Sequence, residues 1–192
     1  MKKLAAQDRS ALIKLASGLS PGSPERVAIL AGLTKQSNDG VNIPGVHILG
    51  NATVKGIARV WGDAVVYGNA VVAGDAKVYD KAEVYGRAEV WGNAHVNDRA
   101  KVYGRAKVYG SAVVWGNARV SDNAEVYGRA TVSGDAWVFD DAKVSGDAEV
   151  KGNAVVLGDA NISGDAVILG GDWDGSEGPI TSGTWKAPGV PA

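Results

Sequence analysis

Apolar and polar residues alternate along most of this chain, and the alternation repeats every six residues. Alanine returns at every sixth position from Ala52 to Ala166. Two residues after each alanine comes valine, up to Val156, and then isoleucine. Glycine follows two residues later, except where aspartate replaces it, at Asp80, Asp98, Asp122 and Asp140. One short phrase therefore fills the chain from Ile48 to Gly170 without an insertion.

Each phrase predicts a short strand and a turn. In residues 64–69, Ala64 and Val66 alternate with Val65 and Tyr67, so alanine and valine share one face of a strand. Gly68 and the asparagine after it are residue types that adopt left-handed backbone angles at low cost. One repeat cannot bury its apolar face alone, and uninterrupted six-residue repeats are typical of a parallel β-helix.

The phrase resembles the hexapeptide repeat of left-handed parallel β-helix proteins, in which three repeats form one triangular coil of 18 residues. The resemblance covers residues 46–171. It implies an all-β fold, a single-stranded triangular left-handed parallel β-helix of about 7 coils. Glycine lies two residues after the aliphatic position here, whereas the family more often has it one residue after.

A period of 18 residues can be tested on the sequence itself, because residues one coil apart should stack. Charges alternate in sign along one outward column, formed by Glu89, Lys107, Glu125 and Lys143. Glu83 lies above Lys101 in another column. Two aromatic ladders are predicted in the same way, Tyr67 with Tyr85 and Tyr103, and Trp91 with Tyr109 and Tyr127.

The first 45 residues do not share the repeat. Residues 1–34 show helical spacing of apolar positions and predict an N-terminal α-helical hairpin, while residues 35–45 form a linker rich in turn residues. The segment faintly resembles short helices at the amino ends of phage structural proteins. Two short helices are not stable alone and must pack on something. The apolar stripes consist of Leu12, Leu15, Leu19, Val27 and Leu30.

The first coils carry an unusually apolar outer surface, which includes Trp61, Val65, Tyr67 and Val71. Either the N-terminal helices cover these residues or another molecule does. We therefore take these four residues and the helical leucines and valine as the candidate interaction residues. At the other end, residues 172–192 predict an irregular C-terminal cap.

Composition excludes several classes of function. The net charge is −1, which gives no general attraction to nucleic acid or to an anionic membrane. There is no cysteine, and no apolar run approaches the ~20 residues needed to span a bilayer. We expect a cytoplasmic protein, or a component of a virion if the chain is viral.

Many hexapeptide-repeat proteins are acyltransferases that act as trimers, bind acyl-coenzyme A between their prisms and use a histidine as base. The resemblance would assign that role to His95, although an exposed outward position favours a structural histidine. The family's enzymes also interrupt their repeats with a loop that builds the acceptor site, and residues 52–166 contain no such loop. The absence of the loop argues against catalysis, so we expect no cofactor.

The segment Asp172-x-Asp174-Gly175-x-Glu177 looks like a fragment of a calcium loop. It lacks further ligands, so we favour a turn in the cap over a metal site. The exposed tryptophans and tyrosines also allow a third reading, a module that binds a small ligand or a glycan.

Taken together, the pattern favours a non-catalytic structural or interaction protein, a rigid scaffold or decoration element docked through its N-terminal helices. An acyltransferase that uses acyl-coenzyme A is the main alternative. The expected partner is another protein or a second copy of the chain, with a trimer as the expected homo-oligomer.

Overall fold

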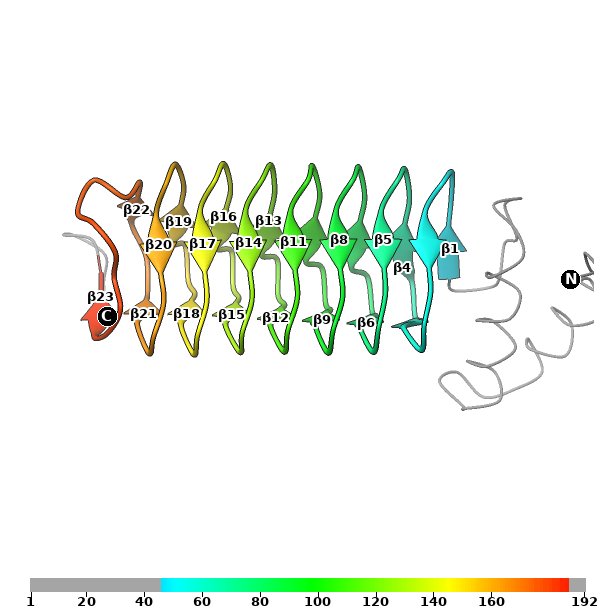
Figure 1. The fold of residues 1–192 in the computed structure, drawn as a ribbon, viewed down its shortest axis with the longest axis horizontal. Coiled ribbons are helices and arrows are strands. Elements are labelled where there is room, and N and C mark those ends of the chain that lie inside the picture. Colours follow the sequence, from blue (N-terminus) through cyan, green and yellow to red (C-terminus); the bar gives the residue numbers. More distant parts are fainter. Residues whose placement is uncertain (1–45, 187–192) are drawn as a thin grey trace, which may run out of the picture.

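A computed structural model describes residues 46–186, in which the chain winds into a parallel β-solenoid with three sheets and no helix. Figure 1 shows the coils stacked along one axis, with the first coil in cyan and the last in red. The predicted helical hairpin at 1–34 and the linker at 35–45 lie outside the described residues, as do residues 187–192 of the predicted cap.

Each coil contributes one strand to each sheet, and consecutive strands of the chain visit the sheets in turn. Sheet A contains β1 (Val46–Ile48), β4 (Ala64–Val66), β7 (Glu83–Val84), β10 (Lys101–Val102), β13 (Arg119–Val120), β16 (Trp137–Val138), β19 (Val155–Val156) and β22 (Asp172–Trp173). Sheet B contains β2 (Thr53–Val54), β5 (Val71–Val72), β8 (Glu89–Val90), β11 (Lys107–Val108), β14 (Glu125–Val126), β17 (Lys143–Val144) and β20 (Asn161–Ile162). Sheet C contains β3 (Arg59–Val60), β6 (Lys77–Val78), β9 (His95–Val96), β12 (Val113–Val114), β15 (Thr131–Val132), β18 (Glu149–Val150), β21 (Val167–Ile168) and β23 (Thr184–Trp185).

The predicted 18-residue period is confirmed by the strand register. Thr53 pairs with Val71, Val71 with Glu89, and Glu89 with Lys107, all in parallel. The same offset holds along the other two sheets as far as β21. Backbone amides of one coil donate to carbonyls of the next at nearly constant length, as from Lys107 to Ala124 at 2.9 Å.

The alanine and valine columns form the core. From Ala64 to Val156 every repeat alanine and every repeat valine is fully buried, and Ile162 and Ile168 are buried where isoleucine replaces valine. Two inward side chains from each of three short strands fill the interior of a coil. The narrow interior explains why the sequence alternates a small residue with a β-branched one instead of using larger side chains.

The corners explain both the glycines and their replacements. Gly92 has a φ of +73°, and a Cβ placed there would lie 2.9 Å from the carbonyl oxygen of Gly110 in the next coil. Asp98 occupies the equivalent place on another edge with a φ of +57°, and its carboxylate accepts a hydrogen bond from the Gly116 amide at 3.1 Å. Asp140 does the same with the Gly158 amide. At these two corners aspartate is therefore tolerated because it adds a hydrogen bond between coils, whereas Asp122 accepts a hydrogen bond from the hydroxyl of the preceding Ser121.

The C-terminal segment differs from the prediction. It adds β22 and β23 to sheets A and C, with a single bridge between Ile162 and Ile180 at the third side, so the solenoid has about eight coils instead of seven. Trp173 takes an inward position and packs against the core, whereas Trp185 remains 39% exposed. The two rings meet edge to face at 5.9 Å. The last coil therefore closes the core with a tryptophan instead of the alanine–valine pair.

Candidate functional site

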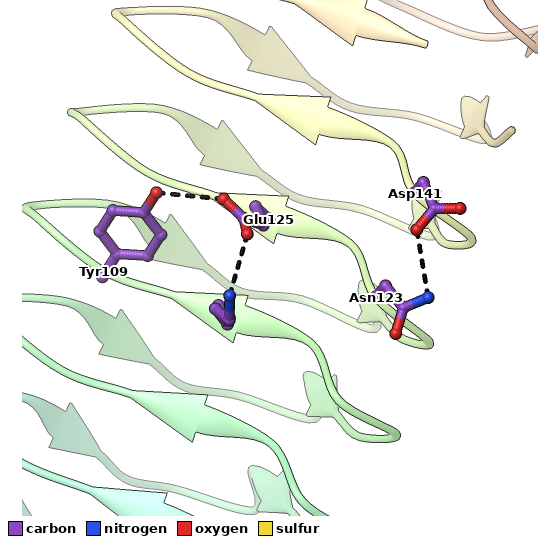
Figure 2. Close-up of polar contacts among 5 residues, drawn as sticks. Tyr109, Asn123, Glu125 and Asp141 are labelled. Atoms are coloured by element: carbon purple, nitrogen blue, oxygen red, sulfur yellow. Dashed lines mark hydrogen bonds and ion pairs between the residues drawn. The ribbon is translucent and has the colours of Figure 1, made fainter. Parts of the chain in front are cut away.

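The outward side chains form columns that run along the solenoid, and the predicted charge column on sheet B is confirmed. Lys107 pairs with both Glu89 and Glu125 in the strand register, and its Nζ lies 3.1 Å from Glu125 Oε1. Figure 2 shows that the hydroxyl of Tyr109 donates to the other oxygen of Glu125, at 3.2 Å. On sheet A, Lys101 Nζ lies 2.9 Å from Glu83 Oε1, as the sequence also predicts.

These contacts shift the pKa of two groups. Partial burial alone would raise the pKa of Glu125, but the hydrogen bonds and charge of Lys107, together with the Tyr109 hydroxyl, lower it below its ordinary value. Partial burial, followed by the charge of Glu125 and the hydrogen bond to it, raises the pKa of Tyr109 to about 12. The arrangement holds Glu125 as a carboxylate and Tyr109 as a hydrogen-bond donor.

Both predicted aromatic ladders are present. Tyr85 stacks between Tyr67 and Tyr103 with centroids 4.7 and 4.9 Å apart, and Tyr109 stacks between Trp91 and Tyr127 at 4.4 and 5.0 Å. The ring planes are nearly parallel, so both faces of a middle ring are covered by its neighbours. A sugar or a base could therefore stack only on the end of a ladder.

A third aromatic pair was missed from the sequence, although the same 18-residue spacing would have found it. Trp61 and Tyr79 stack on sheet C at 4.5 Å. Tyr79 is in turn met edge to face by the ring of His95, at 6.4 Å.

His95 is half-buried on sheet C, where Lys77 and Val113 are its register partners. Partial burial, and then the positive charge of Lys77, lower the pKa of His95. The side chain is thus favoured in its neutral form. His47 lies on β1, where it pairs with Val65 of sheet A, whereas His95 lies on a different sheet, so the two histidines do not share a column.

The acidic residues of the predicted cap lie in strand β22 and in the loop that follows it. Asp174 accepts a hydrogen bond from the Ser176 amide at 2.9 Å, and hydrogen bonds from Ser176 lower the pKa of Asp174. Asp172 lies in β22, and Glu177 is exposed in the following loop. Together with Trp173 they line a cavity of about 30 Å³, room for one or two waters. Within residues 46–186, no three acidic or histidine side chains converge as metal ligands would.

The candidate interaction residues are divided by the structure. Trp61 lies on sheet C, Val65 and Tyr67 on sheet A, and Val71 on sheet B, so these four residues surround the first coils instead of forming one patch. The helical positions Leu12, Leu15, Leu19, Val27 and Leu30 lie outside the described residues.

The N-terminal end of the prism is less closed than its middle. Ile48, Val54 and Val60 take inward positions of the first coil but are only half-buried, whereas the repeat valines that follow are fully buried. Strands β1, β2 and β3 are the first members of their sheets among the described residues.

A groove follows the corner between sheets A and B, a feature that the sequence analysis did not single out. Its volume is about 560 Å³. Figure 2 shows one part of it, where the Asn123 amide nitrogen donates to Asp141 Oδ1 at 3.1 Å. Along the corner edge of the groove Arg105 precedes Asn123, and Asp141 and Asp159 follow it, whereas the edge on sheet B alternates its charges. The lining residues are Arg105, Lys107, Asn123, Glu125, Asp141, Lys143, Asp159 and Asn161.

Comparison with known proteins supports the fold. A family model described as YdcK Beta solenoid repeat matches residues 124–140, which is almost one coil. No curated protein and no solved structure matches the chain. Among the described residues there is also no helix of the length and apolarity that a membrane span requires. The chain is therefore similar over one coil to that solenoid family, and its repeats and its structure make it a parallel β-solenoid repeat protein.

Proposed function

We propose that this chain is a non-catalytic structural or interaction protein, a rigid left-handed β-solenoid that serves as a scaffold or a decoration element. The observation that carries the proposal is the unbroken register. Every strand pair from β2 to β21 keeps the same 18-residue offset, with hydrogen bonds between coils on three sides. A stack of about eight coils at ~4.8 Å gives a rod on the order of 38 Å long, with no hinge inside it.

Docking through residues 1–34 belongs to the same proposal. The incompletely buried Ile48, Val54 and Val60 mark the end at which these residues join the prism, and a solenoid end needs a cover. The apolar stripes at Leu15 and Leu30 have the spacing of helix faces that pack on another surface. In this proposal the segment attaches the rod to a protein partner while the prism stays rigid.

Photo-crosslinking tests the docking. A photoreactive residue placed at Leu15 or Leu30 should give a discrete adduct with a second protein in the cells that produce the chain, because these positions would lie in the contact. The matched control is the same residue at Ser111, an exposed corner of the prism. Adducts that form only within one chain, or equally from Ser111, would count against N-terminal docking.

The absence of catalysis is tested by acetyl-coenzyme A turnover. We expect none from the full chain. Turnover that disappears in His95→Ala, while the variant keeps its melting temperature, would instead establish the acyltransferase with His95 as its base.

A further inference from the structure

Sheet A carries the most apolar outer surface of the three. Beside its strands a column of half-buried rings and aliphatic groups is interrupted only by the small, buried Ser121. Trp137 and Phe139 add a second contact between rings at 4.5 Å. Sheet B, by contrast, presents alternating charges. The apolar column of sheet A consists of Tyr67, Tyr85, Tyr103, Phe139 and Leu157.

Two charged columns border sheet A, one along each corner, and both change sign at the same coil. On the corner with sheet B, cations precede Asn123 and acids follow it. On the corner with sheet C, Lys81 and Arg99 precede Asn117 and Asp135 follows it, although Asp63 begins this column and Asp80 and Asp98 lie beside the two cations. The first column reads Arg87, Arg105, Asn123, Asp141, Asp159 and the second reads Lys81, Arg99, Asn117, Asp135, Asn153, and all ten side chains are exposed.

We propose that a second copy of this chain packs antiparallel on sheet A, about a two-fold axis at the coil of residues 117–123. Reversal of direction about this coil places Arg105 of one copy opposite Asp141 of the other, and Arg99 opposite Asp135. One coil further out, Arg87 meets Asp159. Because a two-fold contact is self-complementary, each of these pairs forms twice.

The apolar column follows the same symmetry. Tyr103 is one coil before Ser121 and Phe139 is one coil after it, so the two rings face each other across the axis. Tyr85 and Leu157 are related in the same way, two coils from the centre. The contact thus has an aromatic centre and a charged rim, which is the arrangement of specific protein interfaces. A parallel pair would instead bring the corner with sheet B of one copy against the corner with sheet C of the other, so Arg105 would face Arg99 and Asp141 would face Asp135.

The cation nearest the axis does not oppose this packing. The guanidinium of Arg119 lies 6.0 Å from the ring centroid of Trp137, one coil toward the C-terminal end. In an antiparallel pair the two Arg119 side chains therefore lean away from the axis in opposite directions. Lys101, one coil earlier, is held by Glu83 of its own chain.

The size of the contact suits a reversible dimer. The five coils between the ends of the two rims span about 24 Å along the rod. Such a face buries on the order of 1,000 Å² in total, at the low end of specific interfaces, so the rim charges decide whether the two copies associate. This inference is separate from the proposed docking through residues 1–34, because it concerns the prism alone.

Charge reversal on the full chain tests the proposal by sedimentation equilibrium at low ionic strength. We expect a dimer whose dissociation constant rises with added salt. Arg105→Asp should weaken it by about tenfold or more, since two attractive pairs become repulsive, and Asp141→Arg should do the same. The double variant Arg105→Asp/Asp141→Arg should restore the dimer, because it rebuilds both pairs with the charges exchanged.

The matched control is Arg129→Asp, a reversal at the corner between sheets B and C, where Arg129 binds Asp147 of its own chain through two hydrogen bonds. This variant should remain dimeric. A full chain that is monomeric or trimeric at all concentrations would overturn the proposal, as would a dimer that Arg105→Asp leaves intact. Failure of the double variant to reassociate, with its melting temperature unchanged, would show that Arg105 and Asp141 do not face each other.

Discussion

Substitution of one corner glycine tests how closely the coils stack. At Gly92 the backbone is left-handed, and a Cβ would lie 2.9 Å from the oxygen and 3.0 Å from the nitrogen of Gly110. These atoms are backbone atoms of the next coil, which is held in turn by the coil after it. They cannot move aside without lengthening hydrogen bonds between coils. We expect Gly92→Ala to destabilise the prism strongly.

The magnitude follows from two costs. A left-handed alanine costs about 1–2 kcal/mol relative to glycine, and the forced displacement of neighbours adds about 1–3 kcal/mol. The control is Gly183→Ala, because Gly183 has a φ of +83° and the added Cβ would meet only the ring nitrogen of Trp185, at an ordinary contact distance of 3.6 Å. Backbone strain and the restriction of the unfolded chain are common to both variants. The difference in unfolding free energy between the two variants, about 1–3 kcal/mol, therefore isolates the steric term.

Urea unfolding followed by circular dichroism measures both variants, with a single transition in each as the condition for comparing them. Gly92→Asp provides a third measurement, because Asp98 and Asp140 show that a carboxylate at such a corner accepts an amide from the next coil. We expect aspartate to cost about 1 kcal/mol less than alanine. Equal costs for alanine at Gly92 and Gly183 would refute the close stacking of the corners, and equal costs for aspartate and alanine at Gly92 would refute the role of the carboxylate.

The remaining predictions concern the charge column and the core. The pKa of Glu125 is lowered in the folded state, so the stability that this carboxylate contributes is present above pH 4.5 and is lost as the pH falls through the folded pKa. The urea midpoint of the parent should therefore drop more in acid than the midpoint of Glu125→Gln. The pKa of Tyr109 is raised to about 12, so the stability that the protonated hydroxyl contributes is present in full below pH 10 and is lost as the pH rises toward 12. The melting temperature of Tyr109→Phe should therefore fall less in alkali than that of the parent. Val126→Ala should cost about 2–3 kcal/mol in urea unfolding, because its side chain is fully buried, whereas Val54→Ala in the half-covered first coil should cost less.

The sequence was sufficient to predict the coil because its period is free of insertions. The pairing of opposite charges at a spacing of 18 residues gave the register, and Lys107 does pair with Glu89 and Glu125. Stacked tyrosines at the same spacing were predicted for the same reason. In both cases the prediction rested on a repeated residue type, which fixes the neighbours of each residue one coil away.

The eighth coil was not predictable from that pattern, because residues 172–185 lack the alanine–valine phrase. Pairing there depends on backbone hydrogen bonds, which any residue type can make, and the offset shortens by one residue where Asp172 pairs with Val155 and Thr184 with Val167. The corner groove was also not predicted, because the turn signal of each corner residue says nothing about the charges of the corner residues one coil away. Reading them as columns would have shown the segregated charges at Arg105 and Asp141.

The interior of this solenoid is almost the same in every coil, so the core cannot determine where along the rod a partner binds. Only the outward side chains differ from coil to coil and can determine that position. On sheet B the signs alternate, so each charge is satisfied by its own neighbours, as Lys107 is by Glu125. On the corner between sheets A and B like charges follow one another, Arg87 before Arg105 and Asp141 before Asp159, an order that repels within a single chain. A column that only had to stabilise the stack would alternate its signs. Segregated signs become favourable opposite a surface with the reverse order, and an antiparallel second copy presents that order along the corner between sheets A and B, where Arg105 would face Asp141.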